Sequence, residues 1–152
     1  MKTLIIYDSV FGNTKIIAEA IARGFGEDAT VVHVSLAKTD FSDVGLVIVG
    51  SPTRAFRPTP VITSFLKSIP AGKLDGIRIA AFDTRVDVKT VNNKFLTFMV
   101  KISGYAVEKI EKLLVGKGGV SAGTSWYCVS ASEGPLLNGE LERAEHWASE
   151  LN

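Results

Sequence analysis

Short apolar runs and longer amphipathic segments alternate along the chain. Runs that are apolar on both faces are typical of strands in a parallel sheet covered by helices. Such runs occur at residues 4–7, 31–34, 46–49, 77–82 and, more weakly, 126–129. Segments whose apolar residues recur every three or four positions are typical of helices packed on a core, and they occur at 14–25, 60–69, 104–115 and 136–151. The alternation predicts an α/β fold of three layers, with helices on both faces of a doubly wound parallel sheet.

Proline indicates where two of these helices begin. Thr59 and Pro60 predict an N-cap followed by the proline that favours the first helical position. Pro135 predicts the start of the last helix. Residues 83–103 show no clear pattern, and they form either a long functional loop or a loop followed by a short helix near residues 95–99.

The length of 152 residues allows one substantial hydrophobic core, so we expect a single domain over 1–152. Seventeen Lys and Arg balance sixteen Asp and Glu, which excludes the strong basic charge of a nucleic-acid-binding protein. The single cysteine, Cys128, cannot form an internal disulfide, as is typical of a reducing compartment. The sequence shows neither a signal peptide nor the ~20 apolar residues of a membrane span. We therefore expect a cytoplasmic protein, monomeric by default.

The loop after the first predicted strand has the composition of an anion-binding site. It reads Ser9-Val10-Phe11-Gly12-Asn13-Thr14 and leads into the first predicted helix. A helix N-terminus offers free backbone N–H groups and the positive end of the helix dipole. Ser9, Asn13 and Thr14 add neutral donors, and Gly12 lets the backbone close on a ligand. The alternative is that Asn13 or Thr14 caps the helix and the rest is turn chemistry.

Two common phosphate-binding motifs are absent from this loop. A nucleotide-hydrolase loop needs Gly-x-x-x-x-Gly-Lys-Ser/Thr, and a dinucleotide fingerprint needs Gly-x-Gly-x-x-Gly. Lys15 is the one cation close by in the sequence. The cradle is therefore predicted to consist of neutral donors.

The whole loop resembles the FMN phosphate loop of the flavodoxin family. Gly50-Ser51-Pro52-Thr53 and Phe82-Asp83-Thr84-Arg85, which follow the third and fourth predicted strands, resemble the two flavin-flanking loops of that family. Two further segments are similar to the terminal-helix region of many flavodoxin-like proteins, namely Glu133-Gly134-Pro135-Leu136 and Gly139-Glu140-Leu141-Glu142-Arg143-Ala144. The likeness covers almost the whole chain, and the length matches the short-chain form.

The resemblance implies a five-stranded sheet of order 2-1-3-4-5 that binds FMN at its topological switch point. There the loops after the first and third strands flank one crevice, with the loop after the fourth next to them. The cofactor-binding residues that it implies are Ser9, Val10, Phe11, Gly12, Asn13, Thr14, Ser51, Pro52, Thr53, Arg54, Ala55, Phe56, Asp83, Thr84 and Arg85.

The sequence departs from the family in the charge and aromatic content of the flanking loops. Many electron-carrying flavodoxins are acidic around the flavin and stack two aromatic rings on it. Here Arg54 and Arg57 give residues 51–59 a charge of +2, and residues 83–89 sum to zero. Each cation stabilises the reduced, anionic flavin by up to ~1 kcal/mol, or roughly 40 mV, unless it points to solvent. Phe56 is predicted to cover one face of the ring, while Val86 stands where a stacking tyrosine is expected, so the other face is open or covered by a partner.

Several other kinds of site are not supported. His33 and His146 lack the spacing of metal ligands, so no metal site is predicted. Cys128 has no arginine six positions later, as a cysteine phosphatase on this sheet would require. The third predicted strand ends in Gly50-Ser51 rather than in the acceptor aspartate of a receiver domain. Trp126 and Tyr127 form either an interaction patch or packing against the last helix.

The leading hypothesis is an FMN-binding electron-transfer flavoprotein that shuttles electrons between a reductase and an acceptor protein, without catalytic residues of its own. The alternative is a small FMN-dependent oxidoreductase with a quinone-type or protoporphyrinogen-type acceptor, which the basic loops favour. A third hypothesis, an interaction module that has lost its flavin, conflicts with the intact loop at 9–14.

Overall fold

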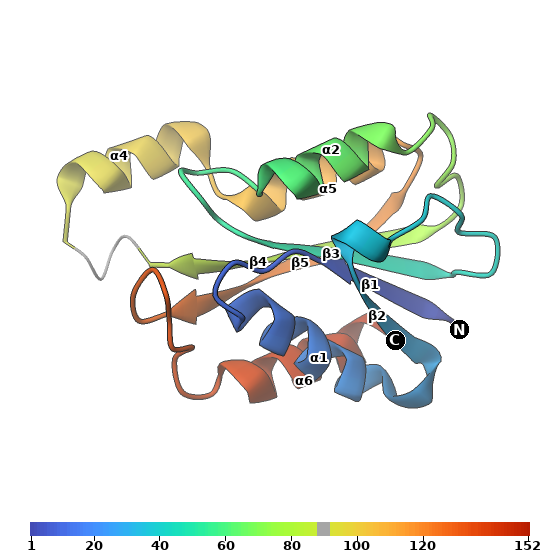
Figure 1. The fold of residues 1–152 in the computed structure, drawn as a ribbon, viewed down its shortest axis with the longest axis horizontal. Helices are drawn as coiled ribbons and strands as arrows, with labels where there is room; N and C mark the ends of the chain where they lie inside the picture. The colour runs from blue at the N-terminus through green and yellow to red at the C-terminus, as the bar shows by residue number, and fades with distance from the viewer. Residues whose placement is uncertain (88–91) are drawn as a thin grey trace.

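The computed structural model describes residues 1–87 and 92–152, and five strands of these residues form one parallel sheet (Figure 1). The strand order is β2-β1-β3-β4-β5, which confirms the predicted topology. The register is continuous from Thr3 opposite Ala29 to Tyr7 opposite His33, and it shifts once between β4 and β5. The strands are β1 (Thr3–Tyr7), β2 (Ala29–His33), β3 (Leu46–Pro52), β4 (Arg78–Val86) and β5 (Val120–Val129).

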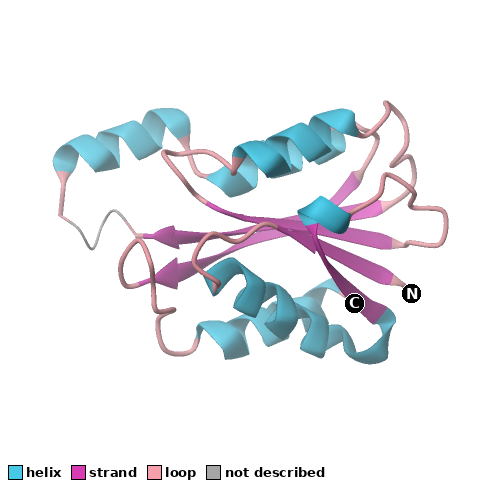
Figure 2. Cartoon of the chain, in the orientation of Figure 1, coloured by secondary structure: helices cyan, strands magenta, loops and turns pink. Residues whose placement is uncertain are grey.

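Helices cover both faces of this sheet (Figures 1 and 2). Two of them, α1 (Asn13–Phe25) and α6 (Glu140–Leu151), lie side by side on one face, and α2 (Pro60–Ser68) and α5 (Ala106–Val115) lie on the other. Short 3-10 turns, η1 (Gly26–Asp28) and η2 (Val34–Leu36), flank β2. Within the described residues, no helix is both long and apolar enough to cross a membrane.

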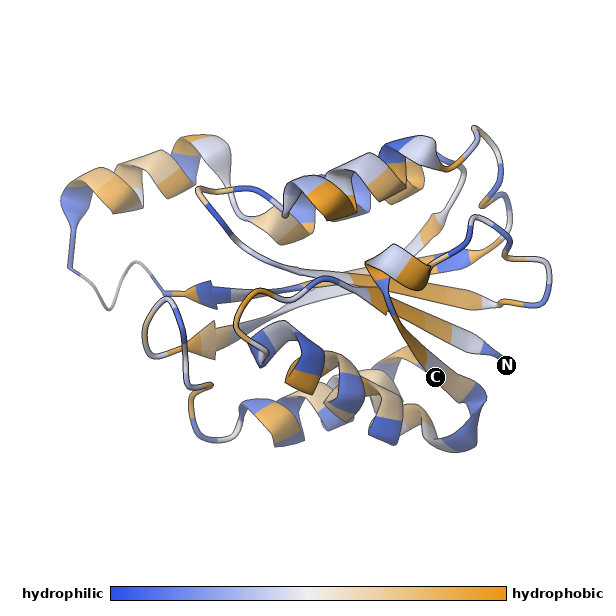
Figure 3. Ribbon diagram, in the orientation of Figure 1, coloured by the Kyte–Doolittle hydropathy of each residue, from blue (hydrophilic) through white to orange (hydrophobic). Residues whose placement is uncertain are grey.

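Two hydrophobic cores separate the layers. One joins α1 and α6 to the sheet and contains Phe82, Tyr127 and Trp147, while the other joins α2 and α5 to the opposite face. The middle of the central strands is apolar and the end of β4 is polar, whereas the helices are apolar on one side and polar on the other (Figure 3). This pattern is the one that a doubly covered parallel sheet requires. Tyr127 is fully buried in the first core, and Trp126, on the opposite face of β5, is 47% exposed.

The last helix begins later than the sequence predicts. It starts at Glu140 after Gly139, whose φ of 88° ends any helical continuation from Pro135. Leu136 instead forms a bridge with Val129, and the N–H of Leu137 donates to the carbonyl of Cys128. These bonds hold residues 136–137 against the end of β5.

Pro60 is the first residue of α2, as predicted, but the Thr59 side chain does not cap this helix. The N–H of Thr63 donates to the Thr59 carbonyl. The hydroxyl of Thr59 is buried and has no hydrogen-bond partner among the described residues. For residues 83–103 the sequence leaves two alternatives, a long functional loop or a loop followed by a short helix. β4 continues to Val86, and a helix, α4 (Lys94–Ser103), precedes α5, so the structure agrees with the second alternative.

Candidate functional site

A cleft of about 470 Å³ opens at the edge of the sheet where the parallel strands end. Four chain segments meet there, namely the loops after β1, β3 and β5 and the last residues of β4. Leu96 of α4 and Tyr105, the residue before α5, complete the walls. The lining residues are Ser9, Val10, Phe11, Asn13, Thr14, Pro52, Thr53, Arg54, Ala55, Phe56, Thr84, Arg85, Val86, Leu96, Tyr105, Val129, Ser132 and Glu133.

The backbone after β1 presents N–H groups at this cleft. Gly12 precedes α1 with φ of 94°, a conformation that side chains disfavour. The first helical hydrogen bond runs from the N–H of Ile16 to the carbonyl of Gly12. The N–H groups of Asn13, Thr14 and Lys15 therefore precede the helical ladder and form the positive end of the α1 dipole. No side chain of the described residues caps α1, which removes the interpretation of Asn13 or Thr14 as a cap.

Four side chains add polar hydrogens around these N–H groups. The hydroxyl of Ser9 accepts the N–H of Gly12 at 3.0 Å, so its own proton points elsewhere. Asn13 donates one amide N–H to the carbonyl of Glu133 at 3.1 Å and keeps a second. The hydroxyls of Thr14 and Thr84 lie 2.8 Å apart, and both residues are almost fully buried. The set consists of neutral donors, because Lys15 is directed to Glu19 one turn along α1.

The loop after β3 is a tight turn in a strained conformation. Arg54 and Arg57 exchange both backbone hydrogen bonds, at 2.8 and 3.0 Å. The two residues between them, Ala55 and Phe56, have φ of 47° and 64°, as in a type I′ turn that normally contains Asn and Gly. The amine of Lys109 on α5 donates to the carbonyl of Phe56 and holds the turn against the body. The half-buried Phe56 side chain is thereby fixed at the cleft.

The two arginines of this turn have different surroundings. The guanidinium of Arg54 lies over the Phe11 ring, 5.6 Å from its centroid, and lines the cleft. Both arginines are exposed, but Arg57 does not line the cleft. The cleft therefore receives one of the two cations that the sequence places in this loop.

A buried ion pair lies near the end of β4, and its arginine lines the cleft. Both carboxylate oxygens of Asp83 accept from the Arg85 guanidinium at 2.7 Å, and one also accepts the N–H of Val107 at 3.0 Å. The guanidinium stacks on the Tyr105 ring at 3.5 Å from its centroid and lies 5.3 Å from that of Trp126. Burial raises the pKa of the Asp83 carboxyl, although Arg85 and Val107 act to lower it. Burial likewise raises the pKa of Tyr105.

Most of the residues implied by the resemblance converge on the cleft, but Gly12, Ser51 and Asp83 do not line it. Gly12 shapes the backbone of the loop. The hydroxyl of Ser51 accepts the N–H of Thr59 and donates to the carbonyl of Pro52, so it braces the turn from beneath. Thr53 combines both roles, since it lines the cleft and accepts the N–H of Ala106.

Sequence reasoning missed the walls supplied by Leu96, Tyr105, Ser132 and Glu133. The turn at Ser132 and Glu133 follows β5, and loops after parallel strands share one edge of the sheet, so topology could have indicated them. Leu96 belongs to the stretch without pattern, and Tyr105 lies at the start of the segment predicted as a helix at 104–115. No sequence signal places either residue at the cleft. Lys89, which entered the charge of residues 83–89, lies outside the described residues.

The described residues contain no cluster of His, Cys, Asp or Glu that could hold a metal ion. His33 lies beside the first loop, with its ring 3.2 Å from Asp8 and 2.8 Å from Ser35. His146 is exposed on α6 next to Glu150. Burial raises the pKa of the Cys128 thiol, and the carboxylate of Glu140 adds to this effect.

Comparison with known protein families shows to which family the chain belongs. A family model described as a flavodoxin domain matches residues 4–118, which include the first loop, the turn after β3 and the buried ion pair. The chain belongs to the flavodoxin family. Rubredoxin-oxygen oxidoreductase of Megalodesulfovibrio gigas is 32% identical over 87 residues, which cover 49% of this chain. The match spans only 22% of that longer relative.

Solved flavodoxins share the whole fold. A flavodoxin from the domain Archaea has a TM-score of 0.75 at 21% identity, with 99% of this chain and 96% of that chain covered. Flavodoxin 1 from Bacillus cereus has a TM-score of 0.75 at 17% identity, with 99% and 97% covered. At these identities the likeness describes the fold, and membership of the family rests on the sequence model.

Proposed function

We propose that the cleft binds FMN and that the protein transfers electrons between redox partners. The observation that carries the proposal is the set of neutral donors around the α1 N-terminus, which opens directly into a cleft bounded by Phe56 and Tyr105. A phosphate, a polar chain and a flat ring system require three such surfaces in one crevice. Membership of the flavodoxin family supports the same cofactor class.

The donor chemistry of the first loop fits a phosphate. The hydroxyl of Ser9 and the second amide hydrogen of Asn13 have protons to donate, as described above. A hydroxyl pair such as Thr14 and Thr84 shares one proton between its oxygens and leaves the other proton for a ligand. The backbone N–H groups of residues 13–15 would supply further donors, and the helix dipole favours the negative charge.

The other walls fit an aromatic ring system. Phe56 would contact one side of the ring, while Val86, Leu96 and Tyr105 supply apolar and aromatic surface elsewhere in the cleft. The cleft volume of about 470 Å³ lies within the ordinary range of cofactor sites. When bound, FMN supplies the reversible electron transfer, and the chain supplies binding, orientation and local charge.

Arg54 would raise the reduction potential of the bound flavin. Its guanidinium lines the cleft, and a cation stabilises negative charge that a reduced flavin gains. The Arg85 charge is balanced by Asp83 and contributes less. A reductase would supply the electrons, and an acceptor protein in the cytoplasm would remove them.

A second candidate is an FMN-dependent oxidoreductase with a quinone-type or protoporphyrinogen-type acceptor. The apolar wall of Val86 and Leu96, together with Arg54 at the same cleft, favours it, since a flat acceptor with polar oxygens would meet both surfaces. In this case the chain itself would turn over the small substrate.

Kinetics of the FMN-loaded protein separate the two candidates. We expect rapid electron exchange with a flavodoxin reductase and slow steady-state reduction of soluble quinones by NAD(P)H. Quinone turnover faster than exchange with the reductase would contradict the carrier and favour the enzyme. The control variant for these rates is Arg57→Gln, which removes an exposed charge outside the cleft and should leave both rates unchanged.

A further inference from the structure

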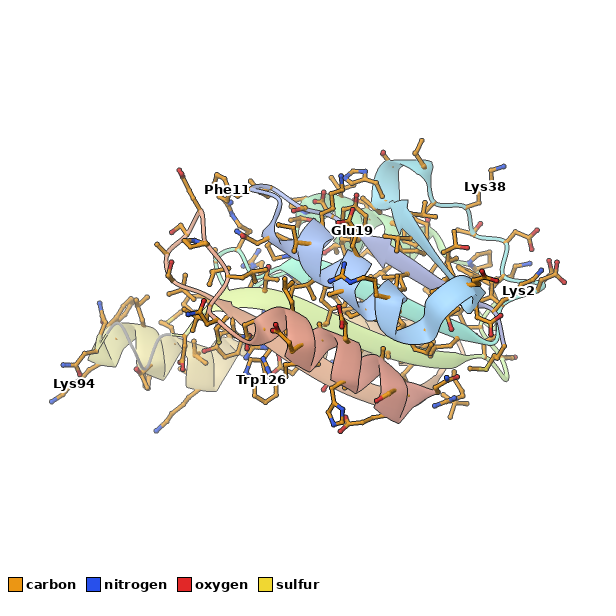
Figure 4. The ribbon with its side chains drawn as sticks, turned by 90° about the horizontal axis from the view of Figure 1, so that it is seen from below. Lys2, Phe11, Glu19, Lys38, Lys94 and Trp126 are labelled. Carbon is orange, nitrogen blue, oxygen red and sulfur yellow. The ribbon has the colours of Figure 1, made fainter. Side chains whose placement is uncertain are left out.

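Helix α4 stands apart from the rest of the fold. It projects beyond the end of the sheet, at the upper left of Figure 1, and Lys94 at its start forms the tip of the molecule in Figure 4. None of its ten residues is buried, although six of them are apolar. A helix with this composition is ordinarily buried against a partner.

The exposed apolar side chains of α4 form one stripe. Phe95, Phe98 and Ile102 are 68%, 58% and 67% exposed, and their spacing of three and four residues places them on one helical face. Leu96, Met99 and Val100 are half-buried, and Leu96 lines the cleft. The stripe is therefore a second apolar surface, separate from the face of α4 that contacts the cleft.

The charge of α4 is entirely positive. Lys94 and Lys101, seven residues apart, lie on the same flank of the stripe, and the helix contains no acidic residue. Within the described ranges 1–87 and 92–152, neither lysine has an ion-pair partner. Asn93 caps the helix by accepting the N–H groups of Phe95 and Leu96, which fixes the start of the stripe.

We propose that α4 is an interfacial helix that docks this protein on an anionic lipid bilayer. Phe95, Phe98 and Ile102 enter the boundary between headgroups and acyl chains, and Lys94 and Lys101 remain at the headgroup level. Lysines beside an aromatic stripe on a projecting helix match the charge of anionic headgroups. The proposal is independent of the flavin and of the electron carrier described above.

A lipid surface explains these features better than a protein partner. Protein interfaces are depleted in lysine and normally bury their apolar anchors in a pocket of the partner. The α4 stripe lies on a helix that projects from the body, and Lys94, Thr97 and Lys101 line a shallow hollow beside Phe98. A bilayer needs no shape complementarity to such a surface. Because Leu96 links the same helix to the cleft, docking would bring the cleft close to the membrane surface.

Vesicle co-sedimentation of the full chain tests the proposal. We expect the protein to sediment with vesicles of phosphatidylcholine mixed with phosphatidylglycerol, and the double variant F95S/F98S to lose at least about ten-fold in partitioning. Both side chains are exposed, so the variant folds, which circular dichroism and thermal melting verify. The matched control is Leu36→Ser, which removes a 75% exposed apolar side chain from η2. It leaves partitioning unchanged.

The lysines provide an independent arm of the same experiment. K94Q/K101Q should lower binding to the mixed vesicles roughly ten-fold or more and make the remaining binding insensitive to salt. Failure of the wild-type chain to sediment with mixed vesicles would overturn the proposal, as would equal sedimentation of F95S/F98S. A stable wild-type dimer that F95S/F98S abolishes, without vesicle binding, would instead assign the stripe to contacts between copies.

Discussion

The hydroxyls of Thr14 and Thr84 lie 2.8 Å apart across the floor of the cleft, although seventy residues separate them in the chain. This contact joins the first turn of α1 to β4 and fixes the Thr14 side chain beside the free N–H groups of the helix. A donor held by a buried partner loses little conformational freedom when it binds a ligand. In the proposed function, Thr14 would thus be held in position before an anion binds.

Replacing Thr14 by Val should weaken FMN binding by roughly 1–3 kcal/mol, because the phosphate loses one donor and the Thr84 hydroxyl loses its buried partner. The measurement is a titration of flavin fluorescence. Thr30→Val, an exposed threonine on β2, serves as the control and should bind FMN normally. Unchanged affinity in Thr14→Val would contradict the role of this hydroxyl.

The two arginines of the turn after β3 provide a matched pair for the potential of the flavin. Arg54→Gln should lower the reduction potential by up to about 40 mV, because this guanidinium lines the cleft. Arg57→Gln should leave the potential nearly unchanged, since that side chain lies outside the cleft. Redox titration of the two loaded variants makes the comparison. Equal shifts would show that the cleft does not distinguish the two charges.

Substitutions in the strained turn after β3 should separate effects on the stability of the fold from effects on FMN binding. Glycine accepts the positive φ of Ala55 and Phe56 without strain, so Ala55→Gly should raise the unfolding free energy by up to about 1 kcal/mol. Phe56→Gly relieves the same kind of strain but removes the ring from the cleft. We therefore expect weaker FMN binding in Phe56→Gly and normal binding in Ala55→Gly, as measured by urea unfolding and FMN titration.

The buried pair of Asp83 and Arg85 should be far more sensitive to loss of the cation than an exposed ion pair. Arg85→Met leaves a buried carboxylate without its partner, at a cost of about 3–5 kcal/mol. Because Arg85 acts to lower the pKa of Asp83, its removal raises that pKa further. A folded pKa above the unfolded one means that stability is lost as pH rises, so the destabilisation should be smaller near pH 4 than at pH 7.

Urea unfolding of Arg85→Met and of the double variant D83N/R85M at both pH values checks this account. The double variant has no carboxylate to bury and should show little of the pH dependence. A destabilisation by Arg85→Met that is equal at both pH values would assign the effect to lost stacking on Tyr105.

Tyr127 should make the fold sensitive to alkali. Burial raises the pKa of Tyr127 to about 12, whereas an unfolded tyrosine ionises near 10. The unfolded state therefore loses its proton first, and stability falls between about pH 10 and pH 12 by up to about 3 kcal/mol. Absorbance titration and unfolding of Tyr127→Phe test this, since the variant lacks that loss. An ordinary tyrosine titration in the folded protein would contradict the burial effect.

Hydrophobic patterning was sufficient to predict the layers and, with the family resemblance, the strand order, because both faces of the sheet are covered by helices. It failed at Pro135, because the sequence does not show that residues 136–137 pair with the end of β5. The start of α6 depends on that long-range contact and on Gly139, not on the local apolar period.

The sequence was sufficient to predict the parts of the candidate site that are contiguous in the chain. It was not sufficient for the parts that depend on contacts between distant segments. The first loop is contiguous, so its donors could be identified from the sequence. The burial of Asp83 beneath Arg85 and Tyr105 depends on contacts between β4 and α5, and no spacing within the chain indicates them. The sequence shows Val86 where a stacking tyrosine is expected, yet Tyr105, nineteen residues further along the chain, brings an aromatic ring to the same cleft.

The most direct test of the central claim is the affinity of the flavin-free protein for FMN compared with riboflavin, which differs by lacking the phosphate. The account predicts that one FMN binds per chain and that riboflavin binds at least about ten-fold more weakly, because the loop at 9–14 holds the phosphate. Thr14→Val should narrow that difference. Equal affinity for the two flavins, or no binding of FMN, would contradict the account.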